Sequence, residues 1–221
     1  MTNEKKLLKY LVPVITILTV LLIILVPIRF LMTPAFVQLE YSMPWFPDDP
    51  YGFSTEERLK YGAPTLKYMT QGEPLSAIAD LTMDDGTPVY NERELKHMDD
   101  VQKITRVVLW ILYGSALLLV AIWSWLFRID QLSWFKKGLA NAGQITAGFM
   151  LVVLFGVALS FDTIFTWFHK IFFEDGTWMF LTSDSLIRMY PTRFWMDIFI
   201  YIGGFVILVG GGLWMKFRKT K

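Results

Sequence analysis

Four long stretches without a charged residue constrain this chain more than any other feature of its sequence. They cover residues 11–28, 107–127, 139–161 and 198–215. A helix of about 20 apolar residues, rising about 1.5 Å per residue, crosses the hydrocarbon of a bilayer, and these stretches are too long for ordinary core helices. Hydrophobic residues make up 54% of the chain, and these stretches hold most of that apolar character. The sequence therefore predicts an all-α membrane protein built on a four-transmembrane-helix bundle.

The basic residues between and beyond these stretches predict how the chain is oriented. They cluster in the N-terminal tail (Lys5, Lys6, Lys9), in the loop after the second stretch (Arg128, Lys136, Lys137) and in the C-terminal tail (Lys216, Arg218, Lys219, Lys221). Residues 33–105, by contrast, contain 13 acidic and 6 basic residues. Because loops rich in lysine and arginine stay in the cytoplasm, we expect a multi-pass protein of the bacterial cell membrane with both termini cytoplasmic. No small-residue cleavage site follows Ile28, so the first stretch is expected to be a retained span.

These signals divide the chain into alternating spans and loops. The expected segments are a cytoplasmic tail with the first span (1–32), an extracytoplasmic cap (33–106), the second span (107–127), a cytoplasmic loop (128–138), the third span (139–168), an extracytoplasmic loop (169–193), the fourth span (194–215) and a cytoplasmic tail (216–221). The fourth span contains Gly203, Gly204 and a run from Gly210 to Gly212. Glycine lets membrane helices approach closely, which predicts tight packing of this span on the others.

The cap is expected to consist of short helices. Ser54 and Glu57 have the spacing of a capping box, in which each side chain accepts the other's backbone N–H. Gly62 is expected to end the helix that this box begins. Pro64 is expected to start another short helix, which Gly72 ends.

The second half of the cap carries signals for a hairpin and for a long helix. Asp85-Gly86 between two short apolar runs predicts a small hairpin. Asn91 and Glu94 form a second capping box. No helix breaker follows for many residues, so one helix is expected to start at Glu92 and to continue into the second span.

Charge, cysteine content and motifs exclude several classes of protein. The chain has 21 Lys+Arg and 20 Asp+Glu, a net charge of +1, so it lacks the basic field that collects nucleic acid. The absence of cysteine excludes disulfides, thiolate metal sites and a cysteine nucleophile. The sequence also lacks glycine-rich phosphate loops, HExxH and GxSxG. We therefore expect no nucleic-acid partner, no metal and no cofactor.

The chain contains two histidines, and the predicted topology places both near the outer membrane surface. His97 lies ahead of the second span, and His169 lies at the outer end of the third. One histidine near a membrane surface is more often an interfacial polar residue than a catalyst. When two histidines lie on the same side, a catalytic pair is as credible as two interfacial polar residues, because imidazole is the side chain best suited to acid–base catalysis at neutral pH.

Two acidic residues near the histidines are candidates for supporting roles. Asp100 follows His97 at i,i+3, so on a helix its carboxylate would lie beside the imidazole and orient it; otherwise it is one more solvated acid of the cap. Asp162 precedes His169 by seven residues and is expected on the same helix face, roughly 10 Å deeper and inside the hydrocarbon. At that depth it is either functional or paired with Arg29 in a structural ion pair.

Aromatic residues crowd the outer ends of the third and fourth spans. They are Trp167, Phe172, Phe173, Trp178, Phe194 and Trp195. An aromatic belt at the membrane interface is the ordinary explanation of such a group. The alternative is that these rings form the wall of a slot for an acyl chain.

Five short motifs make the chain similar to a known family. They are residues 97–101 (HMDDV), 168–173 (FHKIFF), 177–178 (TW), 184–187 (DSLI) and 191–195 (PTRFW). With these motifs in this order, the chain resembles over nearly its whole length the DUF1461 family of integral membrane proteins, which includes the bacterial lipoprotein intramolecular transacylase. The resemblance implies the fold of that family. It also implies an acyltransferase that moves the sn-2 acyl chain of a diacylglyceryl lipoprotein to the α-amino group of the lipoprotein's N-terminal cysteine.

The resemblance further implies the residues and partners of the site. His97 and His169 are the expected catalytic pair. Beyond what the resemblance implies, we expect Asp100, Asp162, Trp178 and Asp184 to support this pair, and the candidates to stabilise an oxyanion are Trp178, Tyr51 and Arg193. The expected partners are membrane lipids and the diacylated lipoprotein.

Elementary chemistry is consistent with two histidines in this reaction. An α-amino group with a pKa near 8 is only about one-tenth neutral at pH 7, so its attack on an ester requires a base. One imidazole removes the proton, and the second, or the same one by relay, returns it to the leaving glycerol oxygen. Because amine and ester belong to one molecule, holding them together contributes a high effective molarity. The step needs neither a serine or cysteine nucleophile nor ATP.

Two functions from other classes remain open at this point. The chain could be a non-enzymatic membrane adaptor whose acidic, proline-rich cap binds another protein. It could also be a haem protein in which one histidine from each of two helices is an axial ligand.

Overall fold

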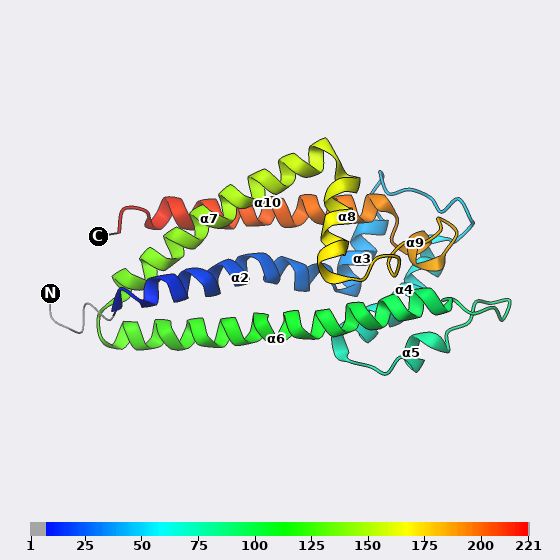
Figure 1. Cartoon of the computed structure of the whole chain (residues 1–221), viewed down its shortest axis with the longest axis horizontal. Helices are drawn as coiled ribbons and strands as arrows, with labels where there is room; N and C mark the ends of the chain where they lie inside the picture. The colour runs from blue at the N-terminus through cyan, green and yellow to red at the C-terminus, as the bar shows by residue number, and fades with distance from the viewer. Residues whose placement is uncertain (1–7, 221) are drawn as a thin grey trace. The chain divides into compact units, whose positions relative to one another are not determined.

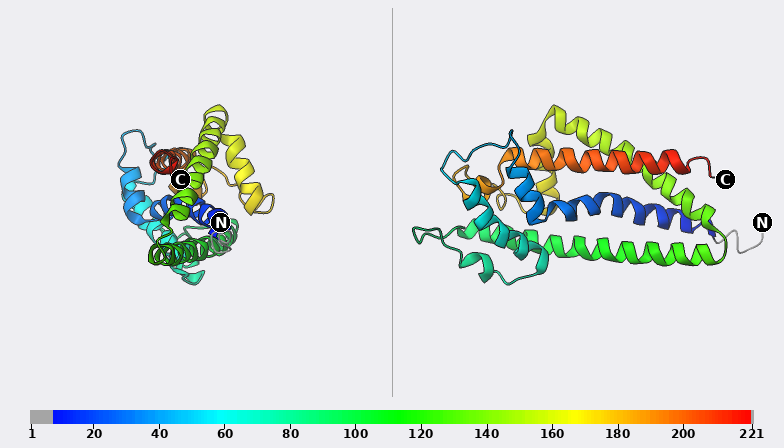
Figure 2. Two further views of the ribbon diagram at one scale, coloured as in Figure 1. Left: turned by 90° about the vertical axis from the view of Figure 1, so that its left-hand side faces the viewer. Right: turned by 180° about the vertical axis from the view of Figure 1, so that it is seen from behind.

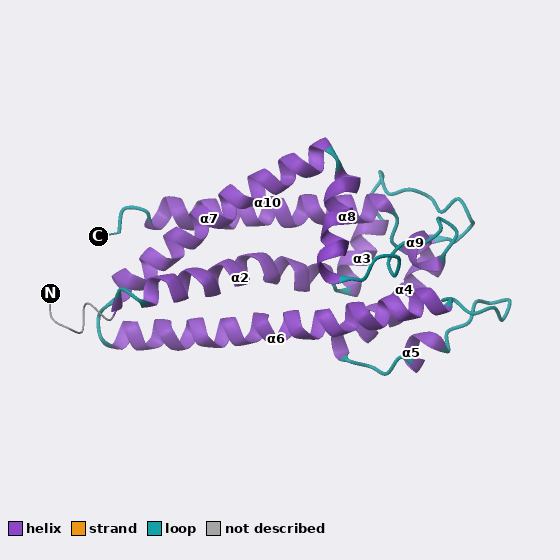
Figure 3. Cartoon of the chain, viewed as in Figure 1, coloured by secondary structure: helices purple, strands orange, loops and turns teal. Residues whose placement is uncertain are grey.

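The structure of the chain is a computed structural model that describes residues 8–220, and every regular element among them is a helix (Figures 1 and 3). In chain order the helices are α2 (Leu11–Leu31), α3 (Pro34–Tyr41), α4 (Thr55–Gln71), α5 (Ser76–Ala79), α6 (Glu92–Arg128), α7 (Leu132–Leu159), α8 (Phe161–Phe172), α9 (Ser185–Met189) and α10 (Thr192–Phe217). The all-α prediction is confirmed for this part of the chain. Lys5, Lys6 and Lys221, which contributed to the predicted orientation, lie outside the described residues.

Four helices among the described residues, α2, α6, α7 and α10, are long and apolar enough to cross a membrane. This confirms the four predicted spans. Helix α6 is one continuous helix that starts at Glu92, as predicted. Its first 15 residues carry eight charged side chains, so the part suited to hydrocarbon begins at Val107.

The chain folds into two compact units. Of the described residues, the span unit contains 8–28, 109–158 and 200–220. Within it, α2, α10 and the later part of α6 run in a common direction, and α7 crosses them obliquely (Figures 1 and 2). Two buried clusters hold these helices together, and they are centred on Ile15, Leu126 and Phe135 and on Ile23, Met150 and Val206.

Glycines bring α7 and α10 into direct backbone contact. A Cβ added at Gly143 would lie 2.3 Å from the carbonyl oxygen of Gly210, and one at Gly203 would lie 2.6 Å from Leu154. The predicted tight packing of the fourth span is therefore confirmed at Gly203 and Gly210. A Cβ would meet nothing within 4 Å at Gly204, Gly211 and Gly212.

The cap unit contains residues 29–108 and 159–199. Its helix α4 begins at the predicted capping box of Ser54 and Glu57 and ends at Gly72, which adopts a left-handed conformation. The predicted break at Gly62 and restart at Pro64 are wrong, because α4 continues through both residues. Gly62 instead lets a side chain approach closely: the Tyr190 hydroxyl lies 3.4 Å from the Gly62 carbonyl oxygen, to which it donates.

The predicted hairpin is reduced to a turn. Residues Thr82 and Pro88 form a single antiparallel bridge, and the Met83 N–H donates to the Thr87 carbonyl at 2.7 Å. No strand forms among the described residues, so the hairpin prediction holds for the turn only. The second capping box is confirmed, with the Asn91 N–H donating to the Glu94 carboxylate at 2.8 Å.

The predicted third span, 139–168, is wrong as one helix. Helix α7 ends at Leu159, Ser160 is extended (φ −161°, ψ 93°), and a separate helix, α8, starts at Phe161. Within the cap unit, α8 runs at a steep angle to the first turns of α6 (Figures 1 and 2). Its composition explains this: Phe161 and His169 are buried on one face, whereas Trp167 and Ile171 are exposed, which is typical of a helix that lies along an interface.

Candidate active site

His97 of α6 and His169 of α8 lie side by side in the cap unit. Their ring centroids are 6.3 Å apart, and the ring planes are inclined by 24°. Both side chains are buried, with 7% and 8% of their surfaces exposed. The structure thus brings together the two histidines that the sequence singles out.

The preceding turn of α8 sets the tautomer of His169. Its Nδ1 lies 2.8 Å from the carbonyl oxygen of Phe165. A carbonyl oxygen can only accept, so Nδ1 carries the proton and Nε2 keeps its lone pair. Burial lowers the pKa of His169, although the Phe165 contact acts in the opposite direction. His169 is therefore a neutral imidazole with a free basic nitrogen.

His97 has a polar atom without a protein partner. Its Nδ1 is buried and forms no hydrogen bond with any residue in 8–220. Burial, followed by the proximity of His169, lowers the pKa of His97 to about 4, and Asp100 opposes this shift. An unpaired buried polar atom costs free energy, so its presence calls for a specific explanation. A substrate group that bonds to this nitrogen would provide one.

Aromatic rings surround both imidazoles. The Phe173 ring centroid lies 4.8 Å from that of His97 and 5.7 Å from that of His169, and Phe180 lies 5.3 Å from His97. Trp178 lies 4.8 Å from His169, and its buried Nε1 has no partner among the described residues. The imidazole pair and its immediate surroundings therefore contain two buried polar atoms without a partner in residues 8–220, His97 Nδ1 and Trp178 Nε1.

The predicted group of aromatic residues separates into three environments. Phe173 and Trp178 contact the histidines, whereas Trp167 and Phe172 are exposed. Phe194 packs on Phe36, Tyr41 and Tyr190, and Trp195 donates to the Tyr190 carbonyl at 3.1 Å. Sequence reasoning missed Phe165 and Phe180, because nothing in their local sequence distinguishes them from other apolar residues.

Glu94 anchors the turn of α6 that carries His97. Its carboxylate accepts the Leu186 N–H at 2.7 Å through one oxygen and the Asn91 N–H at 2.8 Å through the other. The side chain is only 1% exposed, and burial raises its pKa. The capping box is visible in the sequence, but the bond to α9 is not.

Asp184 connects the segment before α9 to the start of α6. Its carboxylate accepts from the Leu181 N–H at 2.8 Å, from the Asn91 amide at 3.2 Å and from Arg93 at 3.3 Å. These contacts order the chain that follows Trp178 and Phe180. None of them joins Asp184 to an imidazole. Its geometry is that of a positioning residue.

Neither Asp100 nor Asp162 orients a histidine through a hydrogen bond, although the charge of Asp100 acts on His97. Asp100 pairs with Lys103 at 3.2 Å, and no hydrogen bond joins it to His97. Asp162 is exposed in the first turn of α8, where the helix dipole stabilises a negative charge. The expectation that Asp162 belongs to one continuous third span is wrong, because the helix breaks at Ser160. The ion pairs among residues 8–220 do not include one between Asp162 and Arg29.

Tyr51 and Arg193, the other candidates for oxyanion stabilisation, bond elsewhere. The Tyr51 hydroxyl lies 2.8 Å from the Thr182 hydroxyl, and Arg193 donates to Asp197 at 2.7 Å. In the described part of the chain, no cluster of three His, Cys, Asp or Glu side chains could hold a metal ion. The free Nε2 of His169 and the unpaired Nδ1 of His97 are groups that suit acid–base chemistry.

Comparison with known proteins identifies similar chains. A sequence model of the family described as lipoprotein intramolecular transacylase Lit matches residues 10–195. An uncharacterized protein of Aquifex aeolicus is 29% identical over 201 residues, which cover 87% of this chain and 89% of that protein. The fold is similar to that of the membrane-integral lipoprotein intramolecular transacylase Lit from Bacillus cereus, with a TM-score of 0.76 and 17% identity over 99% of this chain and 96% of that one. A variant of the B. cereus protein with one histidine replaced by alanine matches with a TM-score of 0.70, 18% identity and coverage of 98% and 94%.

Proposed function

Because this chain belongs to the lipoprotein intramolecular transacylase family, we propose that it transfers an acyl chain within a diacylglyceryl lipoprotein at the outer leaflet. The sn-2 acyl chain moves from the glycerol to the α-amino group of the N-terminal cysteine. The observation that carries this proposal is the buried pair of neutral imidazoles, His97 and His169, with the unpaired Nδ1 of His97.

In the proposed reaction, His169 moves one proton. Its free Nε2 accepts the proton of the amine as the amine nitrogen attacks the ester carbonyl carbon. The new C–N bond forms, the bond between that carbon and the sn-2 oxygen breaks, and His169 returns the proton to the released oxygen. Nitrogen loses one proton and oxygen gains one, so the step needs no water, metal or ATP. The tautomer set by Phe165 leaves the correct nitrogen available.

His97 stabilises the charge that develops on the substrate. It is neutral at pH 7 because burial lowers its pKa to about 4, so one of its ring nitrogens carries a proton that can be donated. Trp178 Nε1, the second unpaired donor, contributes in the same way. Donors that are fixed in a buried, low-dielectric environment stabilise an oxyanion more than donors in water do.

The family assignment favours acyl transfer over the two alternatives. An adaptor requires no pair of buried imidazoles, and the arrangement of His97 and His169 would then have no explanation. The hydrogen bond of His169 Nδ1 to Phe165 supports base catalysis, since it leaves the lone pair of Nε2 available. A purified protein with a Soret absorption band would reopen the haem alternative.

The test is mass spectrometry of a lipoprotein N-terminus from a bacterial host that makes only diacylated lipoproteins. We expect the intact chain to convert it to the lyso form, with one acyl chain on the amine. His97→Ala and His169→Ala should each reduce conversion at least about 100-fold, which is the usual contribution of a positioned acid or base.

Two neighbouring variants serve as controls for this experiment. Lys96→Ala and Lys170→Ala each remove an exposed basic side chain directly before His97 or after His169, and both should convert the lipoprotein normally. Conversion that survives in both histidine variants would contradict the proposal. So would an unchanged lipoprotein in the presence of the folded, membrane-inserted chain.

A further inference from the structure

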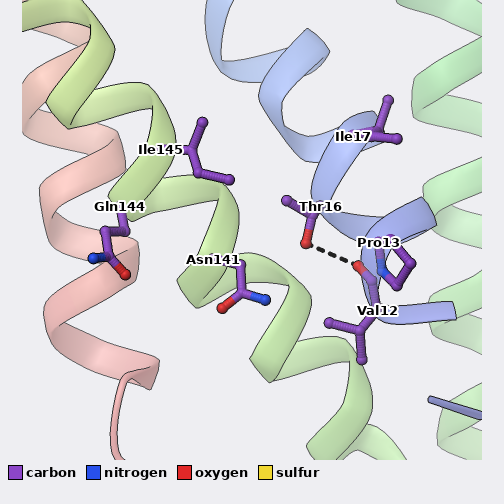
Figure 4. A pocket seen from close by; sticks show the side chains of 7 residues that line it. All are labelled: Val12, Pro13, Thr16, Ile17, Asn141, Gln144 and Ile145. Carbon is purple, nitrogen blue, oxygen red and sulfur yellow. Dashed lines mark hydrogen bonds between the residues drawn. The ribbon is translucent and has the colours of Figure 1, made fainter. Parts of the chain in front are cut away.

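Two adjoining hollows open on the span unit, at the end where α7 begins and α10 ends. The first has a volume of about 320 Å³ and lies between α2 and α7 (Figure 4). The second, of about 160 Å³, lies between α7 and the end of α10. Asn141 and Gln144 border both hollows, which are together called here the α7 groove.

The two halves of the α7 groove differ in character. The half against α2 is lined mainly by apolar side chains such as Val12, Ile17 and Ile145. The half against α10 contains two cations, Lys137 and Arg218. An apolar channel that ends at a cationic hollow matches the shape and polarity of an anionic lipid.

The cations of the α7 groove are held in place and lack acidic partners. Lys137 lies over the ring of Trp134 at 4.9 Å, and Arg218 lies over Trp214 at the same distance. Neither takes part in an ion pair among the described residues. Stacking on tryptophan restrains both cations while leaving their charge available.

Two amides stand between the apolar and the cationic half. In Figure 4, Asn141 points toward α2, and Gln144 lies one turn further along α7 on the side of α10. Both are exposed, and no hydrogen bond of either side chain is formed within residues 8–220. Each amide offers two N–H donors, which suit the ester carbonyls of a lipid.

Charge decides between a lipid and a second copy of this chain as that partner. In the described part of the span unit, Asp130 is the only acidic residue, so a second span unit offers almost no counter-charge for Lys137 and Arg218. The positive-inside rule assigns this end to the cytoplasmic leaflet, where anionic lipids bind basic pockets between membrane helices.

We propose that the α7 groove binds one anionic glycerophospholipid. Its phosphate lies at Lys137 and Arg218, its glycerol ester carbonyls accept from the amides of Asn141 and Gln144, and one acyl chain fills the apolar half against α2. The bound lipid joins α2, α7 and α10 at this end of the span unit. This site is separate from the histidine pair and does not depend on the proposed acyl transfer.

The test is native mass spectrometry of the full chain in detergent with palmitoyl-oleoyl phosphatidylglycerol and the matching phosphatidylcholine as competing probes. We expect one phosphatidylglycerol per chain, preferred about tenfold. Lys137→Gln and Arg218→Gln should each reduce that preference about fivefold, as expected for a basic side chain that contacts an anionic headgroup. Glycerol phosphate should not compete, because it lacks the acyl chain.

Matched variants distinguish lipid binding in the α7 groove from non-specific attraction of anionic lipid to basic residues. Lys136→Gln and Lys219→Gln remove exposed neighbours that do not border the groove and should leave the preference within about twofold. Ile145→Trp fills the apolar half and should reduce retention of both lipids. Equal retention of the two lipids, or equal losses in all four charge variants, would overturn the proposal. A dimer that persists without lipid and breaks in Ile145→Trp would assign the groove to a second copy instead.

Discussion

Burial is what makes His97 and His169 differ from ordinary histidines. Both are more than nine-tenths buried, and both pKa values lie below the usual 6.5, with that of His97 lowered to about 4. A histidine with a lowered pKa remains an unprotonated base at every pH above its own value. At neutral pH the substrate amine is therefore the group whose protonation limits the reaction.

This argument predicts the pH profile of acyl transfer. Between about pH 7.5 and 6.5, the initial rate should fall by no more than about tenfold per pH unit, because only the amine, with a pKa near 8, is being protonated. A steeper fall should begin clearly below pH 6.5, where the histidines gain protons. Initial rates in liposomes measure this profile. A second protonation centred at pH 6.5 would show that the imidazoles are not buried as described.

The buried carboxylate of Glu94 permits a test of the packing behind His97. Glu94→Ala leaves the buried Leu186 N–H without an acceptor, which should cost about 1–3 kcal/mol and lower the thermal midpoint in detergent. Acyl transfer should fall as well, because the first turn of α6 loses its bond to α9. Glu92→Ala, an exposed acid in the same turn, is the control and should change neither quantity. An unchanged midpoint in Glu94→Ala would contradict this role.

At the scale of elements, small residues decide how closely two helices pack. The backbones of α7 and α10 meet at Gly143 and Gly210, where any side chain would overlap a carbonyl oxygen. Gly143→Val should therefore destabilise the span unit by about 1–3 kcal/mol or more, because the helices must separate to admit it. Gly148→Val in the same helix faces open space and controls for the change in helix propensity. Thermal unfolding of both variants makes the comparison, and equal midpoints would exclude this contact as a stabilising one.

The largest difference between predicted and observed elements is in the third span, which the structure divides into α7 and α8. The apolar stretch 139–161 passes through Ser160 without proline or charge, so hydropathy alone extends the third span to the histidine. The structure ends α7 at Leu159, and α8 then buries Phe161 and His169 while exposing Trp167 and Ile171. This amphipathic pattern was present in the sequence and favoured an interfacial helix.

At the scale of the whole molecule, the orientation in the membrane remains a prediction from charge. The chain has no cysteine, so single introduced thiols report their location without background. Ser76→Cys in the cap unit should react with a membrane-impermeant maleimide in intact cells. Lys136→Cys, near the start of α7, should react only after the membrane is permeabilised. Both residues are exposed, so accessibility within the protein does not limit labelling. The reverse pattern would invert the topology and move the histidines to the cytoplasmic face.

The sequence by itself determined the membrane class, the four spans, both capping boxes, the continuous start of α6 and the two histidines worth examining. Each of these rests on local or additive physics: the transfer of about 20 apolar residues into hydrocarbon, or a hydrogen bond between residues three apart. Only the tertiary structure decided the contacts of those residues. It placed His97 against His169, directed Asp100 to Lys103, joined Glu94 to Leu186 and carried α4 through Gly62. Burial and partner choice depend on which distant segments pack together, and no local pattern encodes that arrangement.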